Sequence, residues 1–442
     1  MRNKILTILL LLPLTLSAQN GSNSSYSRFG LGTLSEQSQT FNRGMGGVAY
    51  GLRQGARVNM LNPASYSCLD SLSFIFDVGM TLQYGRLTQN QDRKNTYNAT
   101  LSNINAGFRL ARNVGMSIGF VPFTNIGYTF ARENSVGYSS VSAQNISSSA
   151  TYMGQGGLHQ LYLGVGWKPF ADFSVGVNAS YVWGDYNHSV TQVFSEYNST
   201  NANYNSQCKL YTSDIKTYKL DFGVQYPIAL PNHDRLVLGA TYGVGHKINN
   251  NESYYYRFNT LGDTTTAVAK NGFSLPHTFG VGVAYQHLSK ITVAADYTYE
   301  KWADCTMPLV YITDDNKIVY EAQSGAYHNR SRFAVGAEFV PDLLSRDYFS
   351  TVRYRIGFNY STPYTKVSGP NGIQDGPAEM RLSVGLGLPL TTRRMSGRSV
   401  VNVSAEWMRR KPSAPGLITE NYLMLNLGIS FNEKWFAKWK IN

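Results

Sequence analysis

A set of charged residues falls at alternating positions within segments that otherwise have the composition of apolar β-strands. Arg353 and Arg355 are separated by one residue, and Glu338, Asp296 and Glu406 occupy equivalent positions in other segments. Residues two apart share one face of a strand, so these charges lie opposite the apolar side chains. A guanidinium group there could hold the carboxylate of a ligand. The alternative, which we favour for Arg353 and Arg355, is ion pairing with Glu338, Glu406 or the N-terminal region.

Catalytic and metal-binding signatures are missing from the sequence. The seven histidines form no His-x₃-His or His-Glu-x-x-His arrangement, and no Gly-x-Ser-x-Gly elbow occurs. A triad assembled from distant strands would leave no such signature. Cys68, Cys208 and Cys305 have no metal-like spacing, and their odd number allows at most one internal disulfide of undetermined pairing. We predict a protein that is not an enzyme and has no metal or cofactor.

The elements that carry these charges have the pattern of membrane-crossing strands. In the last strand-like segment, residues 422–431, Leu423, Leu425 and Leu427 alternate with small or polar residues. A tilted strand of about ten residues is long enough to cross a bilayer. Closed barrels are one of the two structures that satisfy every backbone hydrogen bond in lipid. This segment therefore predicts that the protein lies in a membrane as a β-barrel.

Segments of this kind recur along the chain, and their connections alternate in length. Connections are tight after the second, fourth and eighth segments, whereas those after the third, fifth, seventh, ninth and eleventh run to about 16–25 residues. The sequence thus predicts an all-β fold, a 14-stranded antiparallel transmembrane β-barrel. The expected strands lie near 72–88, 96–110, 114–131, 157–168, 172–188, 210–226, 234–249, 273–287, 290–302, 326–340, 348–361, 379–390, 399–410 and 418–431.

The regions outside the predicted barrel have distinct compositions. Residues 1–18 combine a basic start with a short apolar run, which is typical of a secretory signal peptide. Residues 19–71 are rich in glycine, and we expect them to form a hatch that plugs the lumen of the barrel, residues 72–431; a disordered periplasmic arm is the alternative. Residues 432–442 carry lysines and aromatic residues, as expected of a periplasmic tail at the membrane boundary.

Composition agrees with this domain organisation. The chain has 31 Tyr, 21 Phe and 41 Gly, with 15% charged residues and a net charge of +12. Tyrosine-rich sequences of low charge are typical of membrane barrels, in which only alternate residues face lipid. The basic residues are scattered, without a basic helix or zinc motif, which argues against nucleic-acid binding. The positive charge suits acidic lipid head groups or anionic solutes.

Several segments together resemble the FadL-type family of outer-membrane transporters for long-chain fatty acids and other hydrophobic compounds. The matching segments are residues 42–51, Asn62-Pro63-Ala64, residues 275–282, residues 296–302 and residues 332–339. The resemblance implies a 14-stranded barrel closed by an N-terminal hatch. It assigns to that hatch Gly44, Gly46, Gly47, Asn62, Pro63 and Ala64. It also implies that a solute captured by the extracellular loops leaves sideways, through an opening beside a kinked strand.

The predicted function is passive uptake of hydrophobic small molecules across the outer membrane of a Gram-negative bacterium, by a lateral exit. The polar residues 19–25 depart from the fatty-acid transporters, whose first residues help line an apolar pocket. The alternative is therefore a non-transporting barrel that serves as a subunit or docking partner of an outer-membrane secretion or assembly machine. Expected partners are outer-membrane lipid, a hydrophobic solute or other envelope proteins, and the expected state is a monomer.

Overall fold

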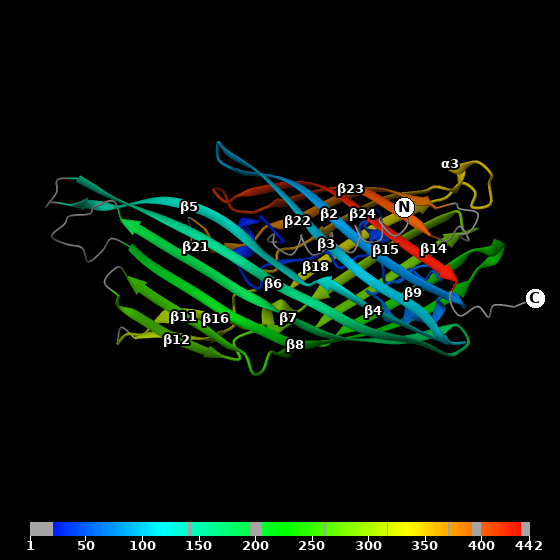
Figure 1. Cartoon of the computed structure of the whole chain (residues 1–442), viewed down its shortest axis with the longest axis horizontal. Coiled ribbons are helices and arrows are strands. Elements are labelled where there is room, and N and C mark those ends of the chain that lie inside the picture. Colours follow the sequence, from blue (N-terminus) through cyan, green and yellow to red (C-terminus); the bar gives the residue numbers. More distant parts are fainter. Residues whose placement is uncertain are drawn as a thin grey trace, which may run out of the picture.

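Fourteen antiparallel strands close into a ring around the N-terminal part of the chain (Figure 1). The computed structural model describes residues 21–139, 144–194, 206–259, 262–315, 317–369, 372–390 and 399–434, so the predicted signal peptide and most of the predicted tail lie outside the described residues. Pairing of the first strand with the last, from Ser73 with Lys434 to Thr88 with Thr419, closes the ring. The predicted fold class is confirmed. The ring consists of β2 (Ser73–Gln89), β3 (Asp92–Ala111), β4 (Val114–Pro122) continued by β5 (Thr124–Ser139), β6 (Gln144–Phe170), β7 (Phe173–Phe194), β8 (Ser206–Ala229), β9 (Arg235–Gly243), β14 (Thr278–His287), β15 (Ile291–Glu300), β18 (Arg330–Phe339), β19 (Arg353–Ser361), β22 (Ala378–Pro389), β23 (Val400–Lys411) and β24 (Thr419–Lys434).

The two faces of the wall differ as the alternation predicts. On β24, Leu423 and Leu425 are exposed on the outside, whereas Tyr422 and Asn426 point inward and are buried. The same holds on β19, where Ile356 is 61% exposed and the adjacent Arg355 only 5%. Charge on the lipid face costs about 2–4 kcal/mol at the bilayer midplane, which accounts for this segregation.

The third strand, for which the sequence predicted a single segment near 114–131, is bent. Its two parts, β4 and β5, meet at Phe123, directly after Pro122, which has no N–H to donate to a ladder. On the neighbouring strand β6, Gly156 and Gly157 adopt φ angles of 119° and 132° at the level of the bend. Such angles favour glycine. The sequence therefore encodes the bend on both strands, through Pro122 on the third strand and through the two glycines on β6. Beyond the bend, β5 runs away from β3 (Figure 1).

The strands next to this bend are much longer than predicted. Long loops were expected after the third and fifth strands, but β6, β7 and β8 run for 27, 22 and 24 residues. About ten residues suffice to cross the bilayer, so the sheet continues well outside it. Serine- and asparagine-rich segments that resemble loops still pair as strands here. We call the end at which β5–β8 extend the projecting end, and the opposite end, with most of the tight connections, the short-turn end.

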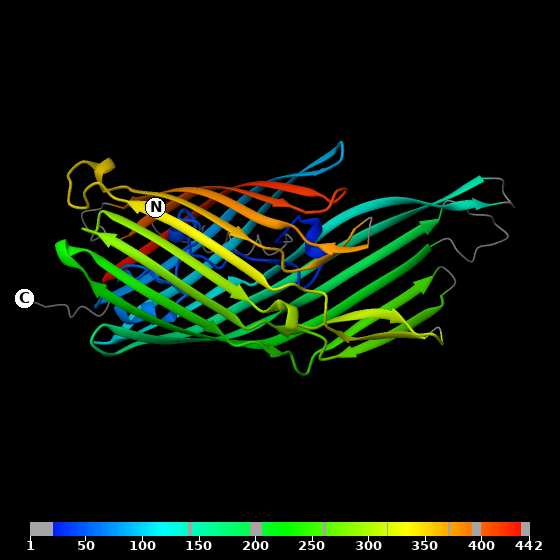
Figure 2. The ribbon, with the colours of Figure 1, turned by 180° about the vertical axis from the view of Figure 1, so that it is seen from behind.

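Further hairpins decorate the projecting end, whereas the helix α3 (Tyr348–Thr351) lies at the short-turn end (Figures 1 and 2). The pair β11 (Glu252–Asn259) and β12 (Thr264–Lys270) extends the wall, because β11 pairs with the upper part of β8. None of the described helices is long and apolar enough to cross a membrane. The remaining elements are η4 (Pro231–His233), β10 (His246–Lys247), β13 (Ser274–Leu275), η5 (Trp302–Asp304), β16 (Met307–Ile312), β17 (Ile318–Gln323), β20 (Lys366–Gly369) and β21 (Gly372–Asp375).

Residues 21–71, which we call the lumenal segment, lie inside the ring and appear in blue in Figures 1 and 2. The segment contains only short elements: η1 (Ser25–Arg28), β1 (Thr33–Leu34), α2 (Thr40–Arg43) and η2 (Pro63–Cys68). Much of it is buried, including Val48, Ala49, Ala64 and Tyr66, all of which have no exposed surface. It packs because its apolar side chains meet the inner face of the wall, and many of its polar groups, such as Thr40 and Arg43, bind wall side chains.

Candidate functional site

A buried carboxylate on the wall gathers three arginines. Glu338 on β18 contacts Arg57 of the lumenal segment (Nη2–Oε2 3.1 Å) and Arg355 of β19 (Nε–Oε2 2.7 Å). Arg353 completes the group at 3.2 Å. Burial lowers the pKa of Arg57 to about 9, although the Glu338 carboxylate acts to raise it. Both predicted arginines are thus engaged with Glu338, as in the ion-pairing alternative.

A second charged network starts at Glu36, which the sequence analysis missed. Its carboxylate contacts Arg332 at 3.0 Å and Arg381 at 3.6 Å, and Arg381 also contacts Glu406 of β23 at 2.9 Å. Burial acts to raise the pKa of Glu36, but the guanidinium groups of Arg332 and Arg381 hold that pKa below its ordinary value. Glu36 lies in a stretch without strand or helix periodicity, so no sequence pattern marked it.

Backbone groups of the lumenal segment are fixed by wall side chains and by its own asparagines. Asp296 on β15 accepts hydrogen bonds from the backbone N–H groups of Ala49 (2.5 Å) and Tyr50 (3.0 Å). The Asn62 side chain donates to the carbonyls of Tyr50 (2.9 Å) and Val224 on β8 (3.1 Å). These contacts satisfy polar groups that would otherwise be buried without partners. Asp296 therefore acts here as an acceptor for the segment.

The predicted glycines and the Asn-Pro-Ala run lie where the segment touches the wall. Gly46 has φ 68°, and a Cβ there would lie 2.7 Å from the carbonyl oxygen of Phe358. A Cβ at Gly44 would lie 3.0 Å from the Cα of Gly385, and Gly47 has φ 77°. Pro63 and Ala64 begin η2, which packs on inward-facing glycines of β6, β7 and β8. Close backbone approach is the reason that these positions are small.

A packed aromatic cluster fills the lumen on the projecting side of the lumenal segment. Trp302, Tyr327, Phe273 and Tyr186 form its centre, with exposed fractions of 7% or less. Trp302 and Tyr327 have ring centroids 5.4 Å apart, and Leu31 of the lumenal segment packs into the same cluster. The apolar groups here contact one another, and Trp302 and Leu275 of the cluster also line the cavity described next.

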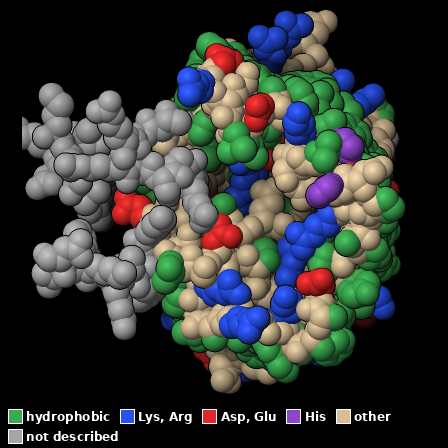
Figure 3. Space-filling view, turned by 90° about the vertical axis from the view of Figure 1, so that its right-hand side faces the viewer, with side chains coloured by type: hydrophobic (Ala, Val, Ile, Leu, Met, Phe, Trp, Pro, Cys, Tyr) green, Lys and Arg blue, Asp and Glu red, His purple; other side chains and the backbone are tan. Residues whose placement is uncertain are grey.

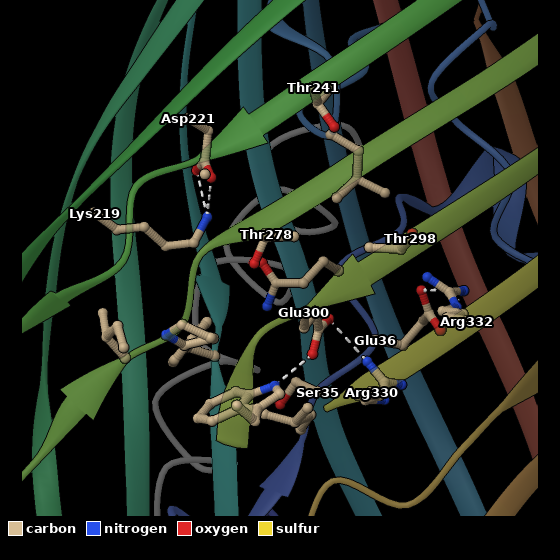
Figure 4. A pocket seen from close by; sticks show the side chains of 18 of the residues that line it. Ser35, Glu36, Lys219, Asp221, Thr241, Thr278, Thr298, Glu300, Arg330 and Arg332 are labelled. Carbon is tan, nitrogen blue, oxygen red and sulfur yellow. Dashed lines mark hydrogen bonds and ion pairs between the residues drawn. The ribbon is translucent and has the colours of Figure 1, made fainter. Parts of the chain in front are cut away.

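A small cavity of about 140 Å³ remains between the lumenal segment and the wall (Figure 4). Its lining combines apolar residues, such as Phe123 at the bend of the third strand, with charged ones. The charges that Figure 4 labels are paired: Lys219 with Asp221, Arg330 with Glu300 at 3.0 Å, and Arg332 with Glu36. Seen from the short-turn end, Lys and Arg side chains also gather around the middle of the molecule (Figure 3).

The wall is interrupted beside the bend. Within the described residues, β3 pairs with β4 only from Ile104 to Ala111, so the rest of β3 and the whole of β5 do not pair with each other. The lumenal segment bridges the two edges. The Ser27 hydroxyl binds the backbone of Gly127 on β5, and the Asn23 side chain donates to the carbonyl of Tyr97 on β3 at 2.8 Å.

Comparisons with known proteins agree with this architecture. A family model described as BamG matches residues 1–442, whereas no curated protein matches the chain. Similar solved structures include the Ralstonia pickettii toluene transporter TbuX, at 13% identity over 90% of this chain and 98% of that one (TM-score 0.59). The Pseudomonas putida toluene transporter TodX is similar at 14% identity over 91% and 100% (TM-score 0.59). A Pseudomonas aeruginosa FadL homologue is similar at 13% identity over 90% and 98% (TM-score 0.56). The resemblance to FadL-type barrels is confirmed at the level of the fold.

Proposed function

The chain belongs to the BamG family, and we propose that it is an outer-membrane barrel that works through its surface, as a non-conducting subunit or docking partner of an outer-membrane secretion or assembly machine. The apolar outer face of the wall supports placement in a membrane. The predicted signal peptide supports export, and an even strand number leaves both chain ends at the periplasmic side. The short-turn end would then face the periplasm.

The observation that carries this proposal is the filling of the lumen. A ring of fourteen strands is wider than the eight-stranded size that wall side chains can fill alone. Here the lumenal segment and the aromatic cluster occupy the space, and buried ion pairs join segment to wall. The cavity between the lumenal segment and the wall, about 140 Å³, is comparable to the cavity of about 150 Å³ that holds a single benzene molecule in another protein. We infer that a barrel filled in this way acts through the partners that its surface binds.

Purification of the full-length protein from its own outer membrane tests this proposal. In-cell cross-linking followed by mild detergent extraction should recover it with other envelope proteins in a fixed stoichiometry. Recovery as free monomer alone, with and without cross-linking, would refute the subunit role.

Passive uptake of small hydrophobic molecules is a second candidate, favoured by the interruption between β3 and β5. The cavity reaches Phe123 at the bend, so a solute in it would lie next to the interruption. The solved structures named as toluene transporters share this fold. On this hypothesis the lumenal segment must move away from β5 for a solute to leave.

A reversible cross-link tests the uptake candidate. Thr33 of β1 and Asn125 of β5 are register partners, so the double variant Thr33→Cys/Asn125→Cys is placed to form a disulfide. Cells that depend on the barrel for toluene entry should lose uptake on oxidation and regain it on reduction. Equal uptake in both redox states, or in cells lacking the protein, would remove this candidate.

A further inference from the structure

The outer edge of β5 is a strand edge without a neighbour. On one side, β5 pairs with β6 from Ile126 onward. On the other side, within the part of the chain that the structure describes, only Thr124 and Asn125 pair, with Leu34 and Thr33 of β1. An unpaired strand edge presents N–H and C=O groups that can pair with another chain.

The direction of the backbone groups follows from the residues already bonded. Gly127 donates its N–H to the Ser27 hydroxyl (3.1 Å), and its carbonyl oxygen lies 3.3 Å from the same hydroxyl oxygen, so its polar groups face away from β6. N–H and C=O groups of successive strand residues alternate in direction. Thr129, Ala131 and Glu133 therefore present their backbone groups at the open edge, whereas Tyr128 and Phe130 bond to β6.

This part of β5 lies in water, and neither a proline nor a bulge interrupts its described edge before Ser135. Thr129, Ala131, Arg132 and Glu133 are exposed, and two of them are charged, which places them beyond the lipid band. Natural edges are protected by proline, by a bulge, by a covering segment or by charged side chains, and of these Arg132 and Glu133 supply the charges here. The first register irregularity on β5 comes only between Ser135 and Gly137, and the stretch before it contains no proline.

One short strand of the same chain, β1, already pairs with this edge, at the part of β5 that is nearest the bend. The β1 residues Thr33 and Leu34 pair antiparallel with β5, and the open stretch continues directly from that pairing. The opposite edge, on β3, is partly occupied, because the Tyr97 carbonyl accepts from Asn23 and the Ala99 N–H donates to the Asn98 side chain. The free edge of β5 is therefore better placed than the β3 edge to pair with another strand.

We propose that the β5 edge around Thr129, Ala131 and Glu133 binds an extended segment of a partner protein, which joins the sheet as an additional strand. Main-chain hydrogen bonds give such an addition its affinity, and alternate side chains give it specificity. On the inner face, Phe130 stacks on Tyr152 (centroids 5.1 Å apart), and the Arg28 guanidinium lies 4.1 Å from the centre of the Tyr152 ring. The partner segment is thus expected to carry apolar or aromatic residues at alternate positions. This inference rests on the proposed docking function and names the surface that serves it.

The test uses the full-length protein in its own outer membrane. A photoreactive amino acid replaces Thr129 at the open edge, and Met153 serves as the matched control. Met153 is the register partner of Thr129 and is also exposed, but its strand β6 is paired on both sides. We expect a discrete protein adduct at position 129 that is at least tenfold stronger than any adduct at position 153.

A second pair of variants ties the adduct to the backbone edge. Ala131→Pro removes an outward N–H without touching the bonds to β6, and proline is tolerated on strand edges. Ala131→Val keeps the N–H. We expect Ala131→Pro to weaken the adduct at least tenfold and Ala131→Val to leave it unchanged, with both proteins showing the heat-modifiable gel mobility of a folded barrel.

The outcomes separate this inference from the proposed function. If Ala131→Pro leaves the adduct unchanged, or if position 129 captures lipid alone, the strand-addition proposal is overturned. If the complex of fixed stoichiometry still purifies with the Ala131→Pro variant, partners bind elsewhere, so the docking function stands and the β5 edge is not its surface. If the wild-type protein has no partner at all, both proposals fail.

Discussion

Arg57 and Glu338 join the lumenal segment to the wall across 281 positions of sequence, with the two atoms 3.1 Å apart and side chains only 8% and 3% exposed. Removing one partner of a buried ion pair is costly, because the other charge remains in a low-dielectric environment. Glu338 is shared by three arginines, whereas Arg57 has Glu338 as its acidic partner. The consequences of mutating the two residues therefore differ.

Glu338→Gln should destabilise the folded barrel more than Arg57→Gln does. The first change leaves three arginines near a neutral amide, for which a loss of about 3–5 kcal/mol is expected. The second leaves the carboxylate with Arg353 and Arg355. Urea-induced unfolding of the detergent-solubilised protein measures both. Lys216→Gln, in an exposed ion pair with Asp214, is the control and should leave the midpoint unchanged. Equal losses for Glu338→Gln and Arg57→Gln would contradict the shared network.

The contact between Glu36 and its arginines should weaken in acid. The pKa of Glu36 is lower in the folded protein than its ordinary value of 4.5, with burial opposing and Arg332 and Arg381 producing the shift. Its stabilisation is therefore present above about pH 4.5 and is lost as pH falls through the folded pKa. Pepsin cleavage of the lumenal segment should be faster in Glu36→Gln than in the wild type at pH 5, and the difference should narrow progressively as the pH falls below 4.5. Comparison at each pH cancels the pH dependence of the protease. A difference that stays constant would argue against this linkage.

Gly46→Ala should prevent the lumenal segment from seating against β19. A left-handed conformation costs an alanine about 1–2 kcal/mol, and here the new Cβ would also meet the Phe358 carbonyl oxygen at 2.7 Å. Gly372 provides the matched control, since its φ of 97° is also unfavourable for alanine but nothing lies within 4 Å of a Cβ there. Trypsin cleavage within residues 21–71 should rise at least tenfold in Gly46→Ala and little in Gly372→Ala. Similar cleavage in both variants would show that backbone strain alone accounts for the effect.

Replacing either of two exposed isoleucines by arginine should have different effects on assembly of the barrel in the outer membrane. Ile356 on β19 is 61% exposed on the lipid-facing wall, and Ile373 on β21 is 76% exposed in a hairpin of the projecting end. Ile356→Arg should lower the amount of folded protein in the outer membrane, since charge near the midplane costs about 2–4 kcal/mol. Ile373→Arg should have no such effect. Quantitative immunoblots of outer-membrane fractions measure the amount of each variant that has the heat-modifiable gel mobility of a folded barrel. Equal amounts for the two variants would show that Ile356 does not face lipid.

The three cysteines, whose disulfide pairing could not be deduced from the sequence, are all free in the structure. Cys68, Cys208 and Cys305 each lie in a different part of the fold: at the end of η2, in the upper part of β8 and beside η5. Spacing along the chain cannot decide such a question, because disulfide formation depends on distances between strands that the sequence does not encode.

The number of strands, the lipid-facing side of each and the inward position of charges such as Arg355 and Glu338 could all be predicted from the amino-acid sequence. These properties are local, because side chains alternate with a period of two along every strand. Tertiary structure alone decided which charges meet, as with Glu36 and Arg332. It also decided that the bend after Pro122 leaves β5 with an open edge, and that polar stretches after the third and fifth strands continue the sheet. Such outcomes depend on contacts between residues as far apart as Arg57 and Glu338, and on how strands of unequal length line up once the ring closes.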